Sequence, residues 1–291
     1  MNEMTAKGMP HFERSGRFER SGRRMLRQAL LIILTFVALY PLYWMIVTAL
    51  KTQPDYLVNK FGLPWPPQFG NVITALRGGR FARWFLNSTI ITVGTTVAST
   101  LIACLAAFAF AKMPFRGSNT ILNFVISLMV VPPVVMIVPL FILYAQLNMN
   151  STYQGIIILY TGLTLPFSVY LLTNFFKTVP NDIVESALID GCRHIGILWR
   201  IYIPLSAPAL VTLVIVNALW MWNELLLALV FLPKDEMRTL MVGITAFKSK
   251  LNLDIPVTMA GLFLSTLPML VLYIVFQRFF IRGLTAGATK G

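Results

Sequence analysis

Residues 177–204, K-T-V-P-N-D-I-V-E-S-A-L-I-D-G-C-R-H-I-G-I-L-W-R-I-Y-I-P, separate two long apolar segments of the chain. Pro180 is expected to begin a helix, because proline is favoured in a first helical turn. Asp182 and Glu185 would then lie in that turn, where the helix dipole favours negative charge. Gly191 can turn the chain, since glycine tolerates left-handed backbone conformations. The pattern predicts a short helix–turn–helix between two apolar helices.

The flanking segments belong to a chain that is too apolar to be a soluble protein. Of its 291 residues, 57% are apolar and 12% are charged, whereas a soluble chain has about 25% charged residues. The mean hydropathy is +0.73, so a bilayer must solvate much of the surface. The net charge of +13 also suits nucleic-acid binding. We interpret it instead as the basic loops of a membrane protein that binds no nucleic acid.

Uncharged runs predict six transmembrane helices, because one span needs about 20 apolar residues. The run of 60 residues contains a polar turn at 147–155 and therefore holds two spans. Pro204 is expected to start the fifth span. The runs contain 23, 28, 60, 23 and 23 residues and lie between Arg27 and Lys51, Arg83 and Lys112, Arg116 and Lys177, Arg200 and Glu224, and Asp254 and Arg278.

The distribution of Lys and Arg predicts that both termini are cytoplasmic. With that orientation fifteen basic residues lie inside and nine outside, as the positive-inside rule requires. The chain is then an all-α polytopic membrane protein in a cell membrane, in contact with lipids. Its expected segments are a basic cytoplasmic tail (1–28), a first transmembrane helix (29–50), an external loop (51–83), a transmembrane core (84–282) with the cytoplasmic loop 178–204, and a cytoplasmic C-terminal tail (283–291).

Prolines and small residues give the expected spans two further features. Alanines at i, i+4 spacing predict close helix contact, and generic bundle packing is sufficient to explain them. The prolines are interpreted as hinges, because transporters use broken helices around a pathway near the membrane midplane. The alanines are Ala103, Ala107 and Ala111, and the prolines are Pro132, Pro133 and Pro139 in the third span, Pro166 in the fourth and Pro268 in the sixth.

The sequence predicts no catalytic residue, no metal site and no cofactor bound by this chain. It lacks a Gly-x-x-x-x-Gly-Lys-Ser/Thr phosphate loop and the common hydrolase motifs. Neither His11 nor His194 has a Cys or carboxylate neighbour at metal-ligand spacing. Only Glu224 is expected at membrane depth, whereas ion-coupled carriers bury several ionisable residues. Energy for uphill transport must therefore enter from another protein.

Four segments resemble the membrane permease subunits of ATP-binding-cassette (ABC) importers. Glu185-Ser-Ala-x-x-Asp190-Gly191, nine residues and then Ile201-x-Ile203-Pro204 resemble their "EAA" loop. Ser186 and Cys192 replace two usual alanines, and both are small. Segments 85–90 (F-L-N-S-T-I) and 276–291 resemble the carbohydrate-uptake branch, as does Trp222-Asn223-Glu224. The ending is similar to that of the smaller membrane subunit of the maltose transporter.

The resemblance implies the type I importer fold and a set of partners. These are a second homologous permease, two ATPase subunits that bind ATP and Mg, and an external solute-binding protein, at a bacterial inner membrane. It also implies that Gly287 and Lys290 in the C-terminal tail reach towards the ATPase dimer interface. The residues expected to couple this chain to the ATPase are Glu185, Ser186, Ala187, Asp190, Gly191 and Pro204.

The expected function is the permease subunit of an ATP-driven sugar importer, with two rivals: an ion-coupled secondary carrier and a structural membrane anchor. Candidate pathway residues in span five are Asn217, Trp220, Asn223 and Glu224, because amides and carboxylates bind hydroxyls and an indole stacks on a pyranose. Interhelical hydrogen bonds and an interfacial aromatic belt are the alternative.

The external segments suggest an acidic saccharide as a minor hypothesis. Nine basic and four acidic residues give them a formal charge of +5, which would concentrate an anionic solute. Arg77, Arg80 and Arg83 would share one side of a helix, and Lys248 and Lys250 lie in the other large external loop. Snorkelling to lipid phosphates and docking of an acidic binding protein remain the alternatives.

Overall fold

The structure is a computed structural model that describes residues 13–77, 80–113, 115–245 and 254–288. These residues form helices and connecting turns and contain no β-strand. Four helices are long and apolar enough to cross a membrane, and two bent pairs bring the number of candidate spans up to six if each pair is one span. The four long helices are α1 (Glu13–Ala49), α4 (Arg80–Lys112), α7 (Tyr153–Thr178) and α14 (Ile255–Ala288).

The two bent pairs are broken by short irregular segments. In the first pair, α5 (Ser118–Ser127) and η1 (Leu128–Val130) meet η2 (Pro133–Met136) and α6 (Ile137–Gln146) at 91°. In the second pair, the segment from α9 (His194–Ile197) through η3 (Leu198–Tyr202) and α10 (Ile203–Leu205) meets α11 (Ala207–Asn223) at 80°.

Prolines interrupt only one of the three spans in which we expected a hinge. The chain leaves the helical conformation at Val131 and Pro132. Pro139, by contrast, lies inside α6, Pro166 inside α7 and Pro268 inside α14, and these helices continue past them. Pro166 and Pro268 therefore do not interrupt their spans, and the backbone groups that each proline leaves unpaired must be satisfied by neighbouring groups.

Span five begins later than the sequence predicts. It begins at Ala207, not at Pro204, which lies in the short helix α10 before a break at Ser206. At its other end α11 stops at Asn223, and Glu224 and Leu225 separate it from α12 (Leu226–Phe231). The break at Ser206 lies inside an uncharged run and no charge marks it, whereas Glu224 itself ends that run.

The core of the molecule is the contact between α4 and α7. Ala103 and Ala107 are fully buried there, so this part of the alanine stripe packs within the chain itself. Gly94 also lies in the contact, because a Cβ at this position would come within 2.8 Å of the Ile157 side chain. Small residues let the two helix backbones approach closely, as in other membrane bundles.

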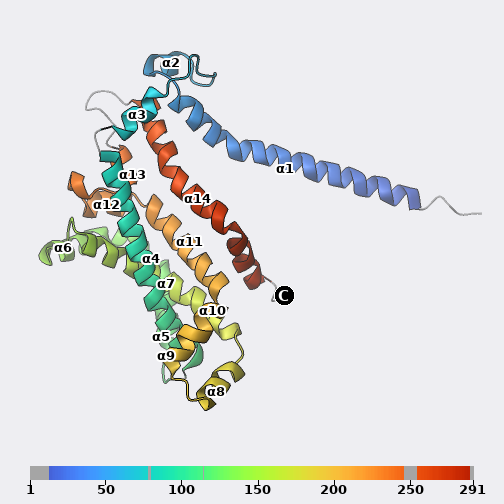
Figure 1. Cartoon of the computed structure of the whole chain (residues 1–291), viewed down its shortest axis with the longest axis vertical. Coiled ribbons are helices and arrows are strands. Elements are labelled where there is room, and N and C mark those ends of the chain that lie inside the picture. The colour runs from blue at the N-terminus through green and yellow to red at the C-terminus, as the bar shows by residue number, and fades with distance from the viewer. Residues whose placement is uncertain (1–12, 78–79, 114, 246–253, 289–291) are drawn as a thin grey trace, which may run out of the picture.

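Short elements cover the two ends of the bundle, which we name the α2 end and the α8 end (Figure 1). The α2 end carries α2 (Gln53–Val58), α3 (Gly70–Leu76), α12, η4 (Asp235–Met237) and α13 (Leu240–Thr245). The α8 end carries α8 (Asp182–Ile189) together with α9. Helix α1 leaves the bundle at the α2 end and projects away from it (Figure 1). Side chains 24–43 of α1 are exposed, whereas Val47, Thr48 and Ala49 are buried.

Candidate functional site

The expected helix–turn–helix is confirmed and forms the tip of the α8 end, but its first helix begins at Asp182 and not at Pro180. Asp182 and Glu185 lie in the first turn of α8, as predicted. Gly191 then adopts a left-handed conformation with φ of +80°, and the turn is closed because the Cys192 N–H donates to the Ala187 carbonyl at 2.9 Å. Glycine suits this position because other residues are strained at such a φ.

The residues expected to contact an ATPase divide between two faces of this loop. Ala187 is 7% exposed and packs on the bundle core, so it fixes α8 to the protein and does not share an outer surface with Gly191. The remaining residues of that set are exposed, and Ile189 beside them is 85% exposed. They are Glu185, Ser186, Asp190, Gly191 and Pro204.

Sequence reasoning missed the residue that joins this loop to the second long helix. The ammonium group of Lys112, at the end of α4, donates to the Val179 carbonyl at 2.6 Å and to Asn181 Oδ1 at 2.7 Å. It also lies 5.9 Å from the centre of the Tyr202 ring. A cavity of about 600 Å³ beside it is lined by polar and apolar groups, among them Lys112, Asn181 and Glu185. In the sequence Lys112 was only one more basic residue at the end of a span.

Glu224 occupies the break in span five and caps the next helix. Its carboxylate accepts hydrogen bonds from the backbone N–H groups of Leu227 at 2.7 Å and Ala228 at 2.9 Å. The Tyr160 hydroxyl donates to the same carboxylate at 2.5 Å. The carboxylate therefore supplies acceptors to the free donors at the start of α12, where the helix dipole also favours negative charge.

The other candidate pathway residues lie in two different surroundings. Asn217 is 2% exposed, and its amide donates to Ser168 Oγ at 3.0 Å and Ser99 Oγ at 3.4 Å, which favours the interhelical hydrogen-bond alternative. Trp220 is 40% exposed and packs edge-on against Tyr160 with ring centres 5.8 Å apart. Asn223 is exposed, and its amide donates to the carbonyl of Leu219 in its own helix.

Trp220 lines a cavity of about 450 Å³ that the broken third span creates. The opposite walls come from η1, η2 and α6 and from α7 around Pro166, with Tyr144 as a polar group in the wall. The indole is therefore the only one of the four candidates that faces a described cavity at the break. This geometry brings the proline-broken segment and span five together, which the sequence order did not indicate.

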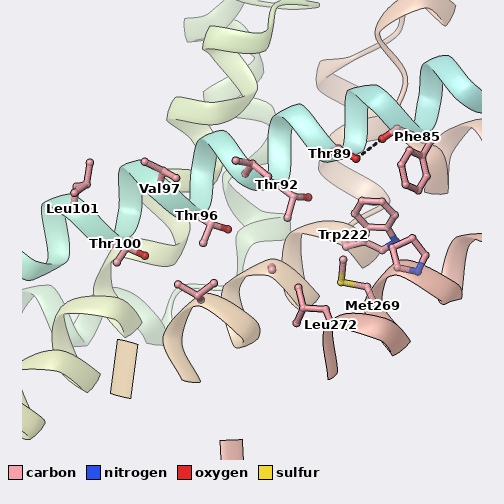
Figure 2. A pocket seen from close by; sticks show the side chains of 14 residues that line it. Phe85, Thr89, Thr92, Thr96, Val97, Thr100, Leu101, Trp222, Met269 and Leu272 are labelled. Atoms are coloured by element: carbon pink, nitrogen blue, oxygen red, sulfur yellow. Dashed lines mark hydrogen bonds between the residues drawn. The ribbon is translucent and has the colours of Figure 1, made fainter. Parts of the chain in front are cut away.

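A third cavity, of about 580 Å³, opens as a groove between α4, α11 and α14. Figure 2 shows Thr92, Thr96 and Thr100 on the side of α4 that faces Trp222 and Met269 across this groove. The hydroxyls of Thr96 and Thr100 are buried and have no hydrogen-bond partner among the described residues. Thr89, one turn earlier, instead donates to the Phe85 carbonyl of its own helix at 2.8 Å.

The segment 85–90 has a structural role at the α2 end. The Asn87 amide donates to the carbonyls of Glu236 and Arg238, both at 2.8 Å, and its oxygen accepts from the Tyr153 hydroxyl at 2.6 Å. Ser88 Oγ accepts the Leu240 N–H at 2.8 Å. The motif therefore fixes the connection between α12 and α13 against α4 and α7.

The arginines before the second long helix do not share one helical side. Arg77 follows α3 in an extended conformation, and Arg80 begins α4, so the helix is broken between them. Arg80 and Arg83 are both exposed on the first turn of α4. Lys248, Lys250 and Lys290 lie outside the described residues, and α14 continues past Gly287 as far as Ala288.

The fold and the exposed loop define a membrane component of a transport system, and comparisons with known proteins agree. Residues 99–284 match the family "Binding-protein-dependent transport system inner membrane component". The sulfoquinovosyl glycerol transport permease SmoH of Agrobacterium fabrum is 34% identical, covering 89% of this chain and 91% of that protein. The trehalose/maltose transport permease MalG of Thermococcus litoralis is 33% identical, covering 92% and 98%.

A solved structure shares this fold. It is the crystal structure of a bacterial ABC transporter involved in the import of the acidic polysaccharide alginate. One of its chains is 25% identical, with a TM-score of 0.79, and the match covers 94% of this chain and all of that one. This chain therefore belongs to the family of binding-protein-dependent transport system inner membrane components, and is an ABC importer permease. The ion-coupled carrier and the structural anchor are thereby both wrong.

Proposed function

We propose that this chain is the permease subunit of an ATP-driven importer of sugars or oligosaccharides. Membership of the permease family carries the proposal, and the exposed loop at the α8 end supplies the surface that an ATPase needs. Several similar permeases are named for saccharides, among them arabinooligosaccharides, diacetylchitobiose and trehalose or maltose.

The proposed arrangement has six spans, with both termini and the α8 end in the bacterial cytoplasm and the α2 end outside. The distribution of basic residues supports this orientation. ATP and Mg would bind to two partner ATPase subunits, and this chain would have no catalytic role. Glu185, Ser186, Asp190, Gly191 and Pro204 would contact the ATPase, with Ala187 fixing α8 behind them. Gly287 and Lys290 would reach towards the ATPase interface.

A second, homologous permease chain would complete the membrane part. Two surfaces favour this partner over lipid alone: the exposed length of α1 and the groove between α4, α11 and α14. The groove wall consists mostly of apolar side chains, such as Val93, Val97 and Leu272, on which a helix of a partner protein can pack closely. The groove is therefore proposed to hold a helix of the second permease.

The proposed solute contact in this chain is Trp220, because its indole faces a cavity beside the break in the third span. Glu224 and Asn217 are occupied by internal hydrogen bonds and would position the surrounding helices instead. An acidic saccharide remains the narrower hypothesis. It is favoured by the exposed Arg77, Arg80 and Arg83 and by the similarity to the alginate importer.

The test is purification in mild detergent followed by reconstitution. The proposal expects an ATPase, a second permease and an external binding protein to co-purify with this chain. Proteoliposomes should then take up the saccharide carried by the binding protein only when ATP is supplied on the α8 side. Uptake that persists without ATP and stops with an ionophore would contradict the proposal.

A further inference from the structure

We name residues 178–204 the coupling loop. Among the side-chain hydrogen bonds and ring contacts of the described residues, only those of Lys112 link the end of α4 to both ends of this loop. On the incoming side, its ammonium binds the Val179 carbonyl, which follows α7, and the side chain of Asn181, which precedes α8. On the outgoing side, the same ammonium faces the ring of Tyr202, which ends η3. A single cation therefore contacts the chain at both ends of the loop.

The Tyr202 ring is held in place by the two long helices of the core. It packs edge-on against Phe108 of α4, with ring centres 5.1 Å apart, and against Phe176 of α7, at 5.3 Å. Tyr202 itself is fully buried. The aromatic contacts resist sideways movement of the loop's outgoing end, while Lys112 adds a directed, charged contact to the same ring.

Helix α8 has few other directional contacts with the bundle. Val184 and Ala187 of α8 pack against the core, but no α8 side chain has a hydrogen bond to another helix among the described residues. The bonds of Lys112 to Val179 and Asn181 are charge-assisted, and such bonds are shorter and stronger than neutral ones. These bonds are therefore suited to transmit a displacement of α8 to α4 in a defined direction.

We propose that Lys112 is a positioning residue that transmits movement of the coupling loop to α4. This inference depends on the proposed function, since an ATPase must move the loop. When the ATPase closes and displaces α8, the Asn181–Lys112 contact moves the end of α4 with it. Because α4 is packed along α7 at its centre and lines the groove on its other side, its displacement reaches the membrane interior.

The experiment uses the whole complex in lipid nanodiscs, with Lys112→Met to remove the charge and Lys112→Arg to keep it. Lys177→Met is the matched control, because Lys177 is an exposed basic residue in the last turn of α7 at the same end of the bundle. Hydrogen exchange of segments 104–112 and 182–189 is compared between the ADP state and the state trapped with ATP and vanadate. ATP hydrolysis is measured with and without the binding protein.

In the wild type and in Lys177→Met, both segments should change their exchange on trapping. In Lys112→Met, segment 182–189 should still respond, whereas the response of 104–112 should be lost, and stimulation by the binding protein should fall at least tenfold. Lys112→Arg should retain both the response of segment 104–112 and the stimulation by the binding protein. A merely structural role would alter exchange equally in both nucleotide states, so the difference between states separates the two explanations.

The inference is overturned if segment 104–112 of Lys112→Met responds as in the wild type, or if stimulation is unchanged. If Lys112→Met does not assemble, Asn181→Ala removes the same contact from the other side and must give the same selective loss. If segment 182–189 of the wild type does not respond to trapping at all, the loop is not the ATPase contact, and the proposed function fails first.

Discussion

The hydroxyl of Tyr160 in α7 donates a hydrogen bond of 2.5 Å to the carboxylate of Glu224, at the break between α11 and α12. The same carboxylate accepts the Leu227 and Ala228 N–H groups, so one side chain joins α7 to the restarted helix. An acidic residue at membrane depth is often part of a solute or ion pathway. Here its acceptors are used to stabilise a broken span.

Glu224→Ala should therefore lower stability. Loss of a helix cap costs about 0.5–2 kcal/mol, and the Tyr160 hydroxyl would also be left buried without its acceptor. The midpoint of thermal unfolding of the purified complex, at a fixed scan rate, should fall by several degrees, while Asn223→Ala should leave it unchanged. An unchanged midpoint with altered solute affinity would instead make Glu224 a pathway residue.

Substitutions at Asn217 and Trp220 should have opposite signatures. Asn217→Ala should destabilise the protein by about 1–2 kcal/mol, because Ser99 and Ser168 lose a buried partner. Its apparent affinity for solute should stay the same. Trp220→Ala should weaken apparent affinity, because the indole faces the cavity. Uptake at graded solute concentrations measures the apparent affinity of both variants. An affinity change in Asn217→Ala alone would reverse these assignments.

Substitutions at Gly191 can distinguish the backbone requirement of this turn from the proposed contact with the ATPase. No atom lies within 4 Å of a Cβ built at this position, so a side chain meets only the strain of a left-handed φ. Gly191→Asn should assemble normally, since asparagine tolerates this conformation, whereas Gly191→Ala should cost about 1–2 kcal/mol. Gly191→Trp should stay in the membrane but lose the ATPase in co-purification. Glu185→Ala should weaken that assembly only slightly, because an exposed ion pair is worth about 0–1 kcal/mol.

Wild-type transport by Gly191→Trp would contradict the coupling assignment of this loop. Normal co-purification of the ATPase with the same variant would contradict it as well. Retention of this chain in the membrane fraction is the control for folding.

The apolar wall of the groove should contribute to assembly with the second permease. Val93→Trp and Val214→Trp together should reduce its co-purification, because two bulky side chains would occupy the space in which the partner helix packs. Thr96→Val and Thr100→Val should assemble normally, because their hydroxyls are buried within this chain. A photo-crosslinking residue at Val97, in the groove wall, should capture the second permease.

The matched crosslinking control is Ile102, which is exposed on α4 about 140° further round the helix and does not line the groove. Capture of lipid alone at Val97, with the second permease present in the purified complex, would contradict the groove proposal. Equal capture at Ile102 would also contradict it.

Substitution of the three exposed arginines before and in the first turn of α4 tests the sign of the charge on the solute. With Arg77, Arg80 and Arg83 all changed to Gln, uptake of an acidic oligosaccharide should fall several-fold at low salt, and less at high salt, because exposed charges are screened. Uptake of a matched neutral oligosaccharide should not change. Equal loss for both solutes would indicate docking of the binding protein, and no loss would indicate lipid anchoring.

The sequence by itself determined the class of the protein and the place of its exposed helix–turn–helix. Uncharged runs mark spans because a charge in hydrocarbon is costly and therefore rare, and the turn at Gly191 follows from local backbone preference. Both properties depend on a residue and its immediate neighbours, so they can be read without the fold. The break at Pro132 was predictable for the same reason.

Only the tertiary structure decided what individual side chains do. Pro166 and Pro268 lie within helices that continue past them, and Glu224 caps a helix whose start no pattern marked. The partners of Lys112 lie 67 and 69 positions further along the chain. Such contacts depend on how separate helices pack, and packing brings distant residues together in a way that residue spacing along one helix does not encode.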